Sequence, residues 1–538
     1  MRRDSYADFV NGNYFSYLWG LIINHSMKKV LTSILLATLF VSAYAENYDF
    51  LLEEAADSTE TVAQTGKKKK AKKQKAPKDS IKTGWNFGPL PAIGYSSDLG
   101  FHYGALCDIY NYGDGSKYPD YIYKFNVEVS AYTKGNIVLH SFFDSKYLIP
   151  GNIRFSAAVS WFANRTYSFY GFNGASSAYI STLDKVWNDK ANSKVDIPFE
   201  PEGTGFYLMQ RDIFRVMTCF QGKFGDSNWG WAGGLSYWWI KTGNARNKKI
   251  TAGTPSLFDL YRKYDVIPEN EANGGHHIEL KAGIVYDTRD FENGPSKGRN
   301  LEVYFFGSPD FFGKWRNNYL KLAIHYRDFY SLGTPKVVFG YHLAYQGLIA
   351  GNAPFYMLQT IQSLNMKQIN TEGLGSTCTL RGTIANRIQG NGYAWANFEI
   401  RWKFVKFDWI KQHWTLALNP FFDMGAVVQP YRWEQMEAAY NAASTTRDYL
   451  KLPKAVTLSD GTVTDVLSER DVIGIAGGKG GLRTERLHMG AGIGLHVIMN
   501  ENFNISFEFA KSLYGHKEDW KTQNDGVWGM NVGLNYIF

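Results

Sequence analysis

One arginine and two carboxylates of this chain have side chains that could form a strong polar contact. Arg381 lies in the run Leu380-Arg381-Gly382, and Glu399 and Asp423 follow it along the sequence. A guanidinium group presents a rigid fork of five donors, which suits bidentate contacts with carboxylates. If the fold brings these three residues together, they would form an ion-paired anchor.

Other candidate sites fit catalysis or metal binding poorly. Residues 294–298 match the pattern G-x-S-x-G, but a nucleophile elbow needs a turn from a strand into a helix, and this segment joins two expected strands. His276 and His277 stand near Glu279, yet adjacent residues of a strand point to opposite faces. The sequence has no P-loop and no dinucleotide-binding fingerprint. We therefore expect no enzyme, no cofactor and no metal site.

The composition excludes several classes of protein. Of 538 residues, 16% are aromatic and 53 are Gly, whereas disordered chains are poor in aromatic residues. Three cysteines, Cys107, Cys219 and Cys378, are too few for a disulfide scaffold and too far apart for a metal site. A helical transporter needs spans of about 20 apolar residues, and only residues 30–45 come near that. The composition favours a large β-protein, and a membrane barrel in particular.

Regular alternation predicts the elements that must position Arg381 and its partners. In residues 527–538, large apolar side chains alternate with Gly and Asn, and the pattern returns in 489–498, 501–512 and 394–404. A period of two is typical of strands with one apolar face. We count sixteen such segments from residue 86 onward, which predicts an all-β protein, a 16-stranded antiparallel transmembrane β-barrel.

A soluble sandwich would alternate in the same way, but two features favour the membrane barrel. Large aromatic residues crowd one face of strand after strand, as on a lipid-facing surface. The long loops at 164–204, 243–274, 349–392 and 429–485 all follow odd-numbered strands. Outer-membrane barrels have long outer loops and short periplasmic turns. The connection at 112–120 is longer than this pattern predicts.

The N-terminal region contains a secretory signal. Residues 27–45 combine the basic pair Lys28-Lys29 with an apolar stretch and an A-x-A cleavage site that ends at Ala45. We expect residues 1–45 to be an extension plus the signal peptide, with the true start at Met27 and cleavage after Ala45. An uncleaved anchor is the alternative.

Residues 46–83 change in character. An acidic segment precedes eight lysines at 67–78, and such charge blocks are usually solvated and disordered. We expect a disordered periplasmic tail. The alternative is attraction of the lysines to anionic head groups. Without these charges, little remains of the +8 net charge of the whole chain to imply a polyanionic partner, so we expect no nucleic acid to bind.

Three stretches together resemble a known family. They are Leu380-Arg381-Gly382, Phe421-Phe422-Asp423-Met424-Gly425, and Tyr286-Asp287-Thr288-Arg289-Asp290 with Pro295 and Gly298 after it. They are similar to those of the BamA/TamA-type outer-membrane assembly and translocation barrels, whose barrel is called the bacterial surface antigen domain. The resemblance covers 84–538 and is strongest over 275–538. It implies a 16-stranded barrel in the outer membrane of a Gram-negative cell.

The resemblance also implies where Arg381 lies, because the sixth outer loop of these barrels folds into the lumen and carries an [VL]-R-G-[FY] tip. Asp423 shares strand parity with Ala417 and Asn419, so it faces the lumen, as does Glu399. We expect Arg381, next to Gly382, to pair with both carboxylates and pin the loop inside. The alternative is that Arg381 is a solvent-exposed loop charge.

Two departures from the family pattern stand out. Thr383 occupies the position where the family prefers an aromatic residue. The family normally has polypeptide-transport-associated domains before the barrel, and the sequence shows none, so we expect a barrel-only member. Its function would be to assist the assembly, insertion or translocation of outer-membrane or surface components. The alternative is a channel or structural surface barrel without insertase activity.

The C-terminal residues also match a family-level pattern. Asn531, Gly533, Tyr536 and Phe538 fit the spacing polar-x-Gly-x-x-aromatic-x-aromatic, which resembles the signal that bacterial barrels present for their own insertion. In the family, client strands pair at the seam between the first and last strands. We therefore expect the bilayer, client outer-membrane proteins or a periplasmic partner as the interacting components.

Overall fold

The structure is a computed structural model. It describes residues 81–96, 100–118, 120–151, 153–180, 205–246, 256–292, 294–309, 318–364, 373–375, 379–409, 412–446, 467–478, 480–499, 503–513, 525–526 and 528–534. The predicted signal peptide and nearly all of the predicted tail lie outside the described residues, and both remain predictions. No helix among the described residues is long and apolar enough to cross a membrane.

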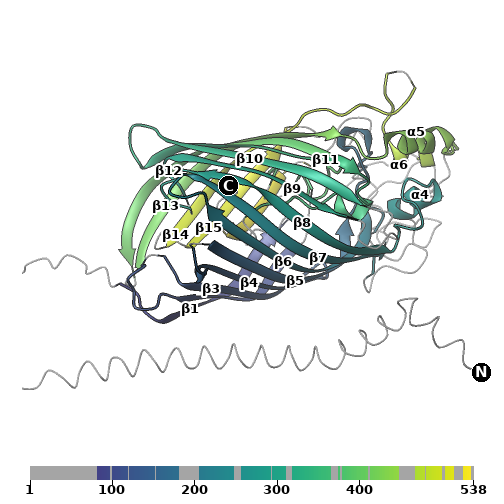
Figure 1. The fold of residues 1–538 in the computed structure, drawn as a ribbon. Coiled ribbons are helices and arrows are strands. Elements are labelled where there is room, and N and C mark those ends of the chain that lie inside the picture. Colours follow the sequence, from purple (N-terminus) through teal and green to yellow (C-terminus); the bar gives the residue numbers. More distant parts are fainter. Residues whose placement is uncertain are drawn as a thin grey trace, which may run out of the picture. The chain divides into compact units, whose positions relative to one another are not determined.

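Sixteen antiparallel strands form a closed barrel, in which each strand pairs with its neighbours in sequence and β1 pairs with β16 (Figure 1). The predicted fold class is confirmed. The strands are β1 Trp85–Ser96, β2 Gly100–Asn111, β3 Tyr123–Tyr132, β4 Asn136–Ile149, β5 Ile153–Ser168, β6 Leu208–Lys223, β7 Trp229–Asn244, β8 Gly274–Asp287, β9 Gly298–Ser308, β10 Tyr319–Ser331, β11 Val337–Gly351, β12 Gly392–Trp409, β13 Gln412–Gln429, β14 His488–Met499, β15 Phe503–Ser512 and β16 Trp528–Leu534.

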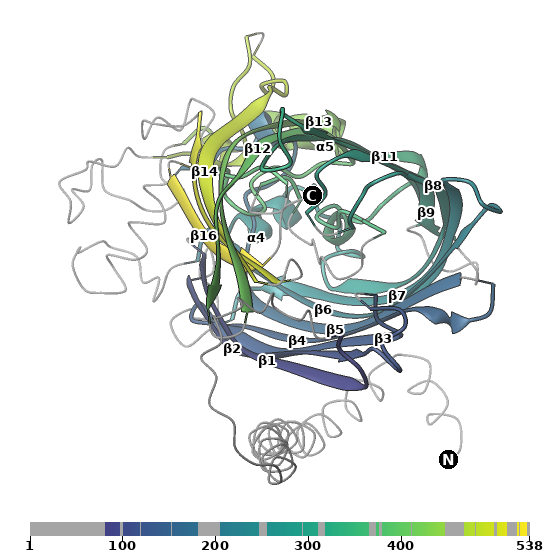
Figure 2. The same ribbon diagram turned by 90° about the vertical axis from the view of Figure 1, so that its left-hand side faces the viewer.

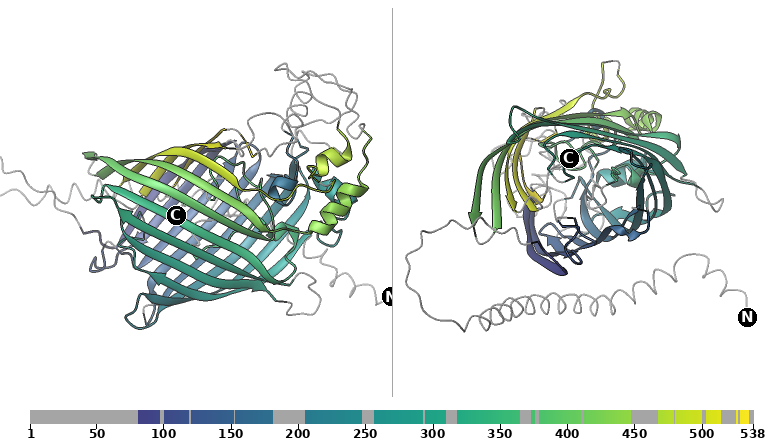
Figure 3. Two further views of the ribbon diagram at one scale, coloured as in Figure 1. Left: turned by 90° about the horizontal axis from the view of Figure 1, so that it is seen from above. Right: turned by 60° about the vertical axis from the view of Figure 1, so that its left-hand side comes forward.

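The alternation of each strand separates two surfaces. On β12, Ile400 and Trp402 are exposed on the outside, while Glu399 and Arg401 are buried on the inside. The other strands follow the same rule, so a belt of apolar side chains surrounds a polar interior, as in outer-membrane barrels. The strands tilt strongly against the barrel axis (Figure 3), which closure of a sheet requires.

The connections differ at the two ends of the barrel. The connections that follow β4, β6, β10 and β12 contain two to five residues, whereas those that follow β5, β7, β11 and β13 are long. The connection between β2 and β3 spans 112–122 and that between β8 and β9 spans 288–297, so these two are longer than the other connections after even-numbered strands. Strand β5 extends beyond its predicted end to Ser168, whereas β6 begins only at Leu208, so the connection predicted at 164–204 spans 169–207.

The outer loops carry short helices that the alternation pattern did not predict. They are α4 Leu257–Lys263, α5 Trp433–Ala442 and α6 Glu469–Ile473, with 3-10 turns at Gly174–Ser176 and Phe355–Met357. The three helices gather at one end of the barrel (Figure 1).

A buried aromatic cluster holds these outer loops together. Phe172 contacts Tyr261 and Tyr431 with ring centroids 5.5 and 4.8 Å apart, and Phe258 lies 6.1 Å from Phe355. These residues come from four different loops, and each is at most 2% exposed. Aromatic pairs at such distances stabilise beyond their buried area, so the loops form a cap with a core of its own.

Candidate functional site

Arg381 lies inside the barrel and contacts three carboxylates. Its Nε and Nη2 donate to the two oxygens of Asp423 at 2.8 and 2.9 Å, and its backbone N–H donates to Asp423 at 3.0 Å. Nη1 donates to Glu399 at 2.7 Å and to Glu508 at 3.0 Å. The guanidinium also stacks on the ring of Phe421, 3.5 Å from its centroid. Four of the five N–H groups of the guanidinium are therefore directed at lumen-facing carboxylates.

The site is almost completely removed from solvent. Arg381 is 2% exposed, Glu399 1% and Asp423 0%. A second arginine, Arg401, donates from Nε to the other oxygen of Glu399 at 2.9 Å. Burying charges costs free energy unless they are paired and hydrogen-bonded. Here the carboxylates and guanidinium groups compensate one another, so the cluster anchors the loop to strands β12, β13 and β15.

Two glycines make room for the loop tip. Gly382 has φ 87°, a left-handed conformation that favours glycine. A Cβ on Gly490 of β14 would lie 1.9 Å from the carbonyl oxygen of Arg381, far inside contact distance. The run of glycines along the inner face of β14 therefore allows the backbone of the loop tip to lie directly on the barrel wall.

Further contacts fix the loop between β11 and β12 along the inner wall. Leu380 is fully buried in a small cluster with Leu374, Ile388 and Trp395. The carbonyl oxygen of Thr379 accepts a 2.6 Å hydrogen bond from Asn397 Nδ2. The loop enters the barrel and occupies part of its interior, which the view along the barrel shows (Figure 2).

The same loop reaches strands on the other side of β11. Arg211 of β6 donates to the carbonyl oxygen of Tyr356 at 2.8 Å, and Gln346 of β11 donates to that of Thr360 at 2.8 Å. Gln362 donates to Glu279 of β8 at 3.1 Å. The loop is therefore bonded to a wide arc of the wall and not only at its tip.

The structure brings together the predicted residues Arg381, Glu399 and Asp423, and places Gly382 beside them. Sequence reasoning missed Glu508, although it lies on the polar face of an alternating strand and the parity argument could have found it. Thr383 is 4% exposed and its hydroxyl has no hydrogen-bond partner among the described residues. A small residue thus sits in a buried position where the family prefers an aromatic ring.

A second polar cluster near the outer rim was also missed. His488, at the start of β14, contacts Asp525 and Glu485, each at 2.6 Å. Arg387 lies 3.7 Å from Asp525 and donates to Ser177 at 2.9 Å. These residues come from loops far apart in the sequence, so no local pattern indicated them. They join the cap to the end of the barrel wall.

The motif at the end of β8 holds the turn between β8 and β9. Arg289 contacts Asp287 through Nε and Nη2 at 3.0 and 2.7 Å. Asp290 accepts hydrogen bonds from the backbone N–H groups of Ser296 and Lys297 at 3.0 and 3.3 Å, and from the Ser296 hydroxyl. Burial acts to raise the pKa of Asp290, but these hydrogen bonds outweigh it and lower the pKa. The turn joins two strands, so Ser296 is not on a nucleophile elbow.

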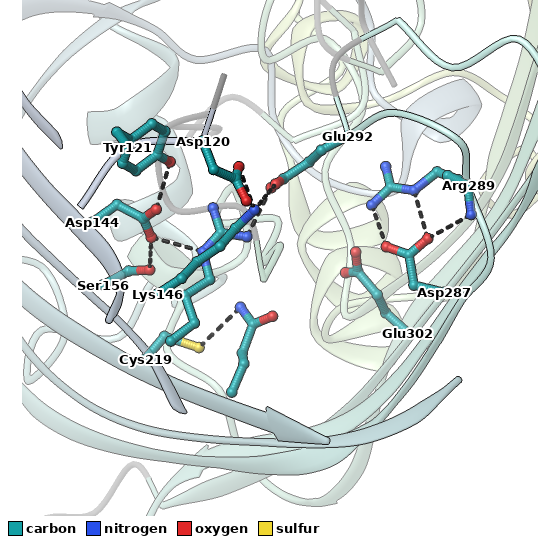
Figure 4. Close-up of polar contacts among 12 residues, drawn as sticks. Asp120, Tyr121, Asp144, Lys146, Ser156, Cys219, Asp287, Arg289, Glu292 and Glu302 are labelled. Atoms are coloured by element: carbon teal, nitrogen blue, oxygen red, sulfur yellow. Dashed lines mark hydrogen bonds and ion pairs between the residues drawn. The ribbon is translucent and has the colours of Figure 1, made fainter. Parts of the chain in front are cut away.

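This turn also contacts β4 and β5 of the neighbouring wall. Glu292 accepts from Arg154 Nη1 at 2.8 Å and lies 3.9 Å from Lys146 Nζ (Figure 4). Burial acts to raise the pKa of Glu292, but Arg154 and Lys146 outweigh it and lower the pKa to about 2. The side chain of Glu292 is still 42% exposed, so solvent weakens the contact.

Asp144 is the centre of the same network on β4. It accepts from Arg154 Nε at 2.8 Å and from the hydroxyl groups of Tyr121 and Ser156 at 2.6 and 2.5 Å (Figure 4). We call Asp144, Lys146, Arg154 and Glu292 the inner-rim network. It connects two parts of the wall that are three strands apart.

The closure between β1 and β16 is the weakest pairing of the described barrel. In the register of Ser96 with Asn531, the described part of β16 ends at Leu534, opposite Ile93, and of these four positions one forms a register pair. The described residues of β16 pair with β15 at seven positions. A Cβ on Gly94 would lie 3.0 Å from the carbonyl oxygen of Val532, so the two backbones approach at their outer ends. Of the predicted C-terminal signal, Asn531 and Gly533 lie in β16 opposite Glu508 and Ser506, and Tyr536 and Phe538 lie outside the described residues.

Comparison with solved structures finds several similar barrels. BamA from Haemophilus ducreyi lacking POTRA domains 1-3 is 16% identical, with a TM-score of 0.44 over 84% of this chain and 70% of that chain. CdiB from Escherichia coli is 10% identical, with a TM-score of 0.46 over 84% of this chain and 62% of that one. CdiB from Acinetobacter baumannii is 11% identical, with a TM-score of 0.39 over 84% and 60%.

The chain spans less than two thirds of the length of either CdiB chain, and likenesses at these scores carry no functional argument. No curated protein sequence matches the chain. A family model described as the Omp85 superfamily domain matches residues 124–536. That match covers most of the chain and agrees with the 16-stranded barrel and its apolar outer belt. This outer-membrane β-barrel therefore belongs to the Omp85 superfamily, which points to outer-membrane assembly or translocation in general.

Proposed function

We propose that this barrel assists the insertion or export of outer-membrane or surface components, in the manner of the BamA/TamA-type barrels. The observation that carries the proposal is the sparse β1–β16 pairing: of the four positions where the described residues of the two strands overlap, one forms a register pair. An unpaired strand edge presents free N–H and C=O groups, which are a template for another extended chain. A barrel with a purely structural or channel function does not require an exposed strand edge.

The proposed role is non-enzymatic. The chain would bind the edge strand of a client barrel through backbone hydrogen bonds, and the bilayer would receive the client from the seam. A periplasmic partner would deliver clients. The anchored loop supports this role, because it stiffens β12 to β15 next to the seam through the contacts of Arg381 with Asp423, Glu399 and Glu508.

Depletion of the protein in its native cell, followed by quantitative proteomics of the outer membrane, tests the proposal. We expect several outer-membrane barrels to fall in abundance. Re-expression of the intact protein should restore them. Unchanged barrel levels after depletion would refute the proposal.

A structural surface barrel is the second candidate function. The cap favours it, because residues such as Phe172, Tyr261 and Tyr431 give the outer loops a core of their own. Under this alternative, removal of the cap helices would abolish a surface phenotype such as adhesion while outer-membrane protein levels stay constant. The same proteomic measurement therefore distinguishes the two functions.

A further inference from the structure

Strand β1 contains two prolines, Pro89 and Pro91, near the middle of its length. Proline has no backbone N–H and is found in sheets where that donor is not needed. Both prolines pair in register with β2, opposite Cys107 and Ala105, and the β1–β2 ladder continues through them without a shift. Their missing N–H groups must therefore point away from β2.

Backbone hydrogen bonds next to the strand establish this direction. The N–H of Gly84 donates to Gly113 at 2.8 Å, and the carbonyl oxygen of Gly84 accepts from Tyr112 at 2.9 Å. Gly84 thus directs both of its backbone groups toward the β2 side. In antiparallel sheets successive residues direct these groups to alternate neighbours. Even-numbered residues of β1 consequently face β2, and odd-numbered residues, including Pro89 and Pro91, face the seam with β16.

The seam edge of β1 is therefore divided into two parts. Six residues face the seam, and they are Trp85, Phe87, Pro89, Pro91, Ile93 and Tyr95. Only four of them carry an N–H, and the two without one lie at the centre. Any strand placed beside this edge would have two carbonyl groups without a donor. In the hydrocarbon region there is no water to replace these hydrogen bonds.

A proline inside another strand of this barrel, Pro420 of β13, coincides with missing strand pairing on one side. Pro420 lies inside β13, and its pairing with β14 continues through Ile493. On the β12 side, register pairs are recorded at Glu399 with Phe421 and at Trp402 with Leu418, but none for the two positions between them. One proline therefore coincides with a local gap in an interior ladder that is long on both sides.

We propose that Pro89 and Pro91 remove two donors from the seam edge of β1, so that neither β16 nor an inserted client strand can be hydrogen-bonded along the full strand. The inference rests on the proposed function for its client, but its statement about β16 does not. The prolines act as positioning residues that keep the seam exchangeable. The register pair of Ser96 with Asn531 lies outward of both prolines, where donors are present again.

The double substitution Pro89→Val with Pro91→Val tests the proposal on the full chain in lipid nanodiscs. Valine suits a strand and introduces an amide N–H at each position. Residue-resolved hydrogen–deuterium exchange then reports directly on these two amides. We expect both to exchange slowly, by about tenfold or more relative to an unbonded edge amide, because the seam ladder extends inward. Exchange at the rate of an unbonded amide would overturn the proposal.

The experiment includes a matched control and a second variant that tests the proposal independently of the double substitution. Pro335→Val removes a proline from an exposed turn between β10 and β11, and it should leave exchange along β1 unchanged. The second variant, Ile93→Pro, has the opposite effect to the double substitution, because it removes an N–H donor from the outer part of the seam edge instead of adding one. We expect faster exchange at Tyr95 in that variant, and unchanged exchange there would count against the proposal even if the double variant failed to fold.

The cellular readout separates this inference from the proposed function. If the introduced amides are protected and outer-membrane barrel levels fall, both are supported. If the amides are protected and barrel levels do not change, the role of the prolines in the seam stands and the proposed function fails. If the amides exchange freely, the role of the prolines fails whatever the barrel levels show.

Discussion

Arg381 shows how much a single residue can organise inside a barrel. Its guanidinium group contacts Asp423, Glu399 and Glu508 and stacks on Phe421. A buried ion pair contributes little net stability when it is intact, but removal of one partner leaves charges buried without compensation. The main contribution of Arg381 is therefore to neutralise carboxylates that would otherwise be buried without a counter-charge.

Arg381→Ala should destabilise the folded barrel by about 3–5 kcal/mol, the range for a broken buried pair, and should release the loop tip. The free energy of unfolding can be measured by urea titration in detergent, with the heat-induced band shift on gels as a second readout. Arg381→Lys keeps the charge but loses the planar fork. Its free energy of unfolding should therefore lie between those of the intact protein and Arg381→Ala. Wild-type stability in Arg381→Ala would show that the cluster does not anchor the loop.

Glu292 predicts a pH dependence of the inner rim. Its pKa is lowered to about 2 in the folded barrel, against roughly 4.3 for an unperturbed Glu. A lowered pKa means that the contact with Arg154 contributes fully above the unperturbed value and is lost as the pH falls toward the folded value. A fluorophore at the exposed Phe291, attached through Phe291→Cys in a cysteine-free background, should keep its anisotropy at about pH 4 and lose it as the pH falls toward about 2, where Glu292 becomes protonated in the folded barrel.

The Glu292→Gln variant is the control for this titration. It lacks the charge at every pH, so its anisotropy should be low already at neutral pH and should change little on acidification. A flat profile in the protein that retains Glu292 would show that the contact does not restrain the turn. High salt should mimic part of the acid effect, because the glutamate is partly exposed.

The sequence predicted those site residues that strand parity or a family motif identifies, and it did not predict the others. Parity placed Asp423 and Glu399 inside, and the motif supplied Arg381. Glu508 obeyed the same parity but belonged to no motif. The contacts of His488 with Asp525 and Glu485 depend on loops that meet only in the folded protein, so residue type and spacing held no signal for them.

At the scale of elements, strands were predictable and helices were not. Each barrel strand has to satisfy a lipid-facing and a lumen-facing surface, so its alternation is strong in the sequence. Helices α4 and α6 have seven and five residues, too short to be stable without tertiary contacts. They depend on the aromatic core of the cap, which no local window of sequence contains.

Gly490 allows a test of how the loop element is seated. A Cβ at this position would lie 1.9 Å from the carbonyl oxygen of Arg381, so Gly490→Ala should push the loop tip away while leaving every charged group in place. We expect the loop to become sensitive to protease, as in Arg381→Ala. Gly529→Ala is the control, because no atom lies within 4 Å of the added carbon. Equal protease resistance in the two glycine variants would contradict this seating.

For the whole molecule, the unequal ladders imply a preferred opening line. Over the described residues of β16, seven register pairs join it to β15 and one joins it to β1. A disulfide across that line, from Ser96→Cys with Asn531→Cys in a background without native cysteines, should block client insertion. Reductant should restore it. We would measure outer-membrane barrel assembly under oxidising and reducing conditions.

A disulfide across a fully paired boundary is the control for that experiment. Phe87→Cys with Ile109→Cys joins β1 to β2 at an existing register pair, and it should leave assembly unchanged in both redox states. If the seam disulfide forms and assembly continues at its normal rate, the opening line is not needed for function.

The anchored loop has a consequence for the cell that carries this barrel. Polar bonds tie the loop to strands from β6 to β15, from Arg211 to Glu508, and the cap closes over the outer end with its own aromatic core. A wide barrel without such fillings would let ions, detergents and antibiotics diffuse across the outer membrane. We expect single-barrel conductance to be small, so a bacterium could carry many copies without weakening its permeability barrier.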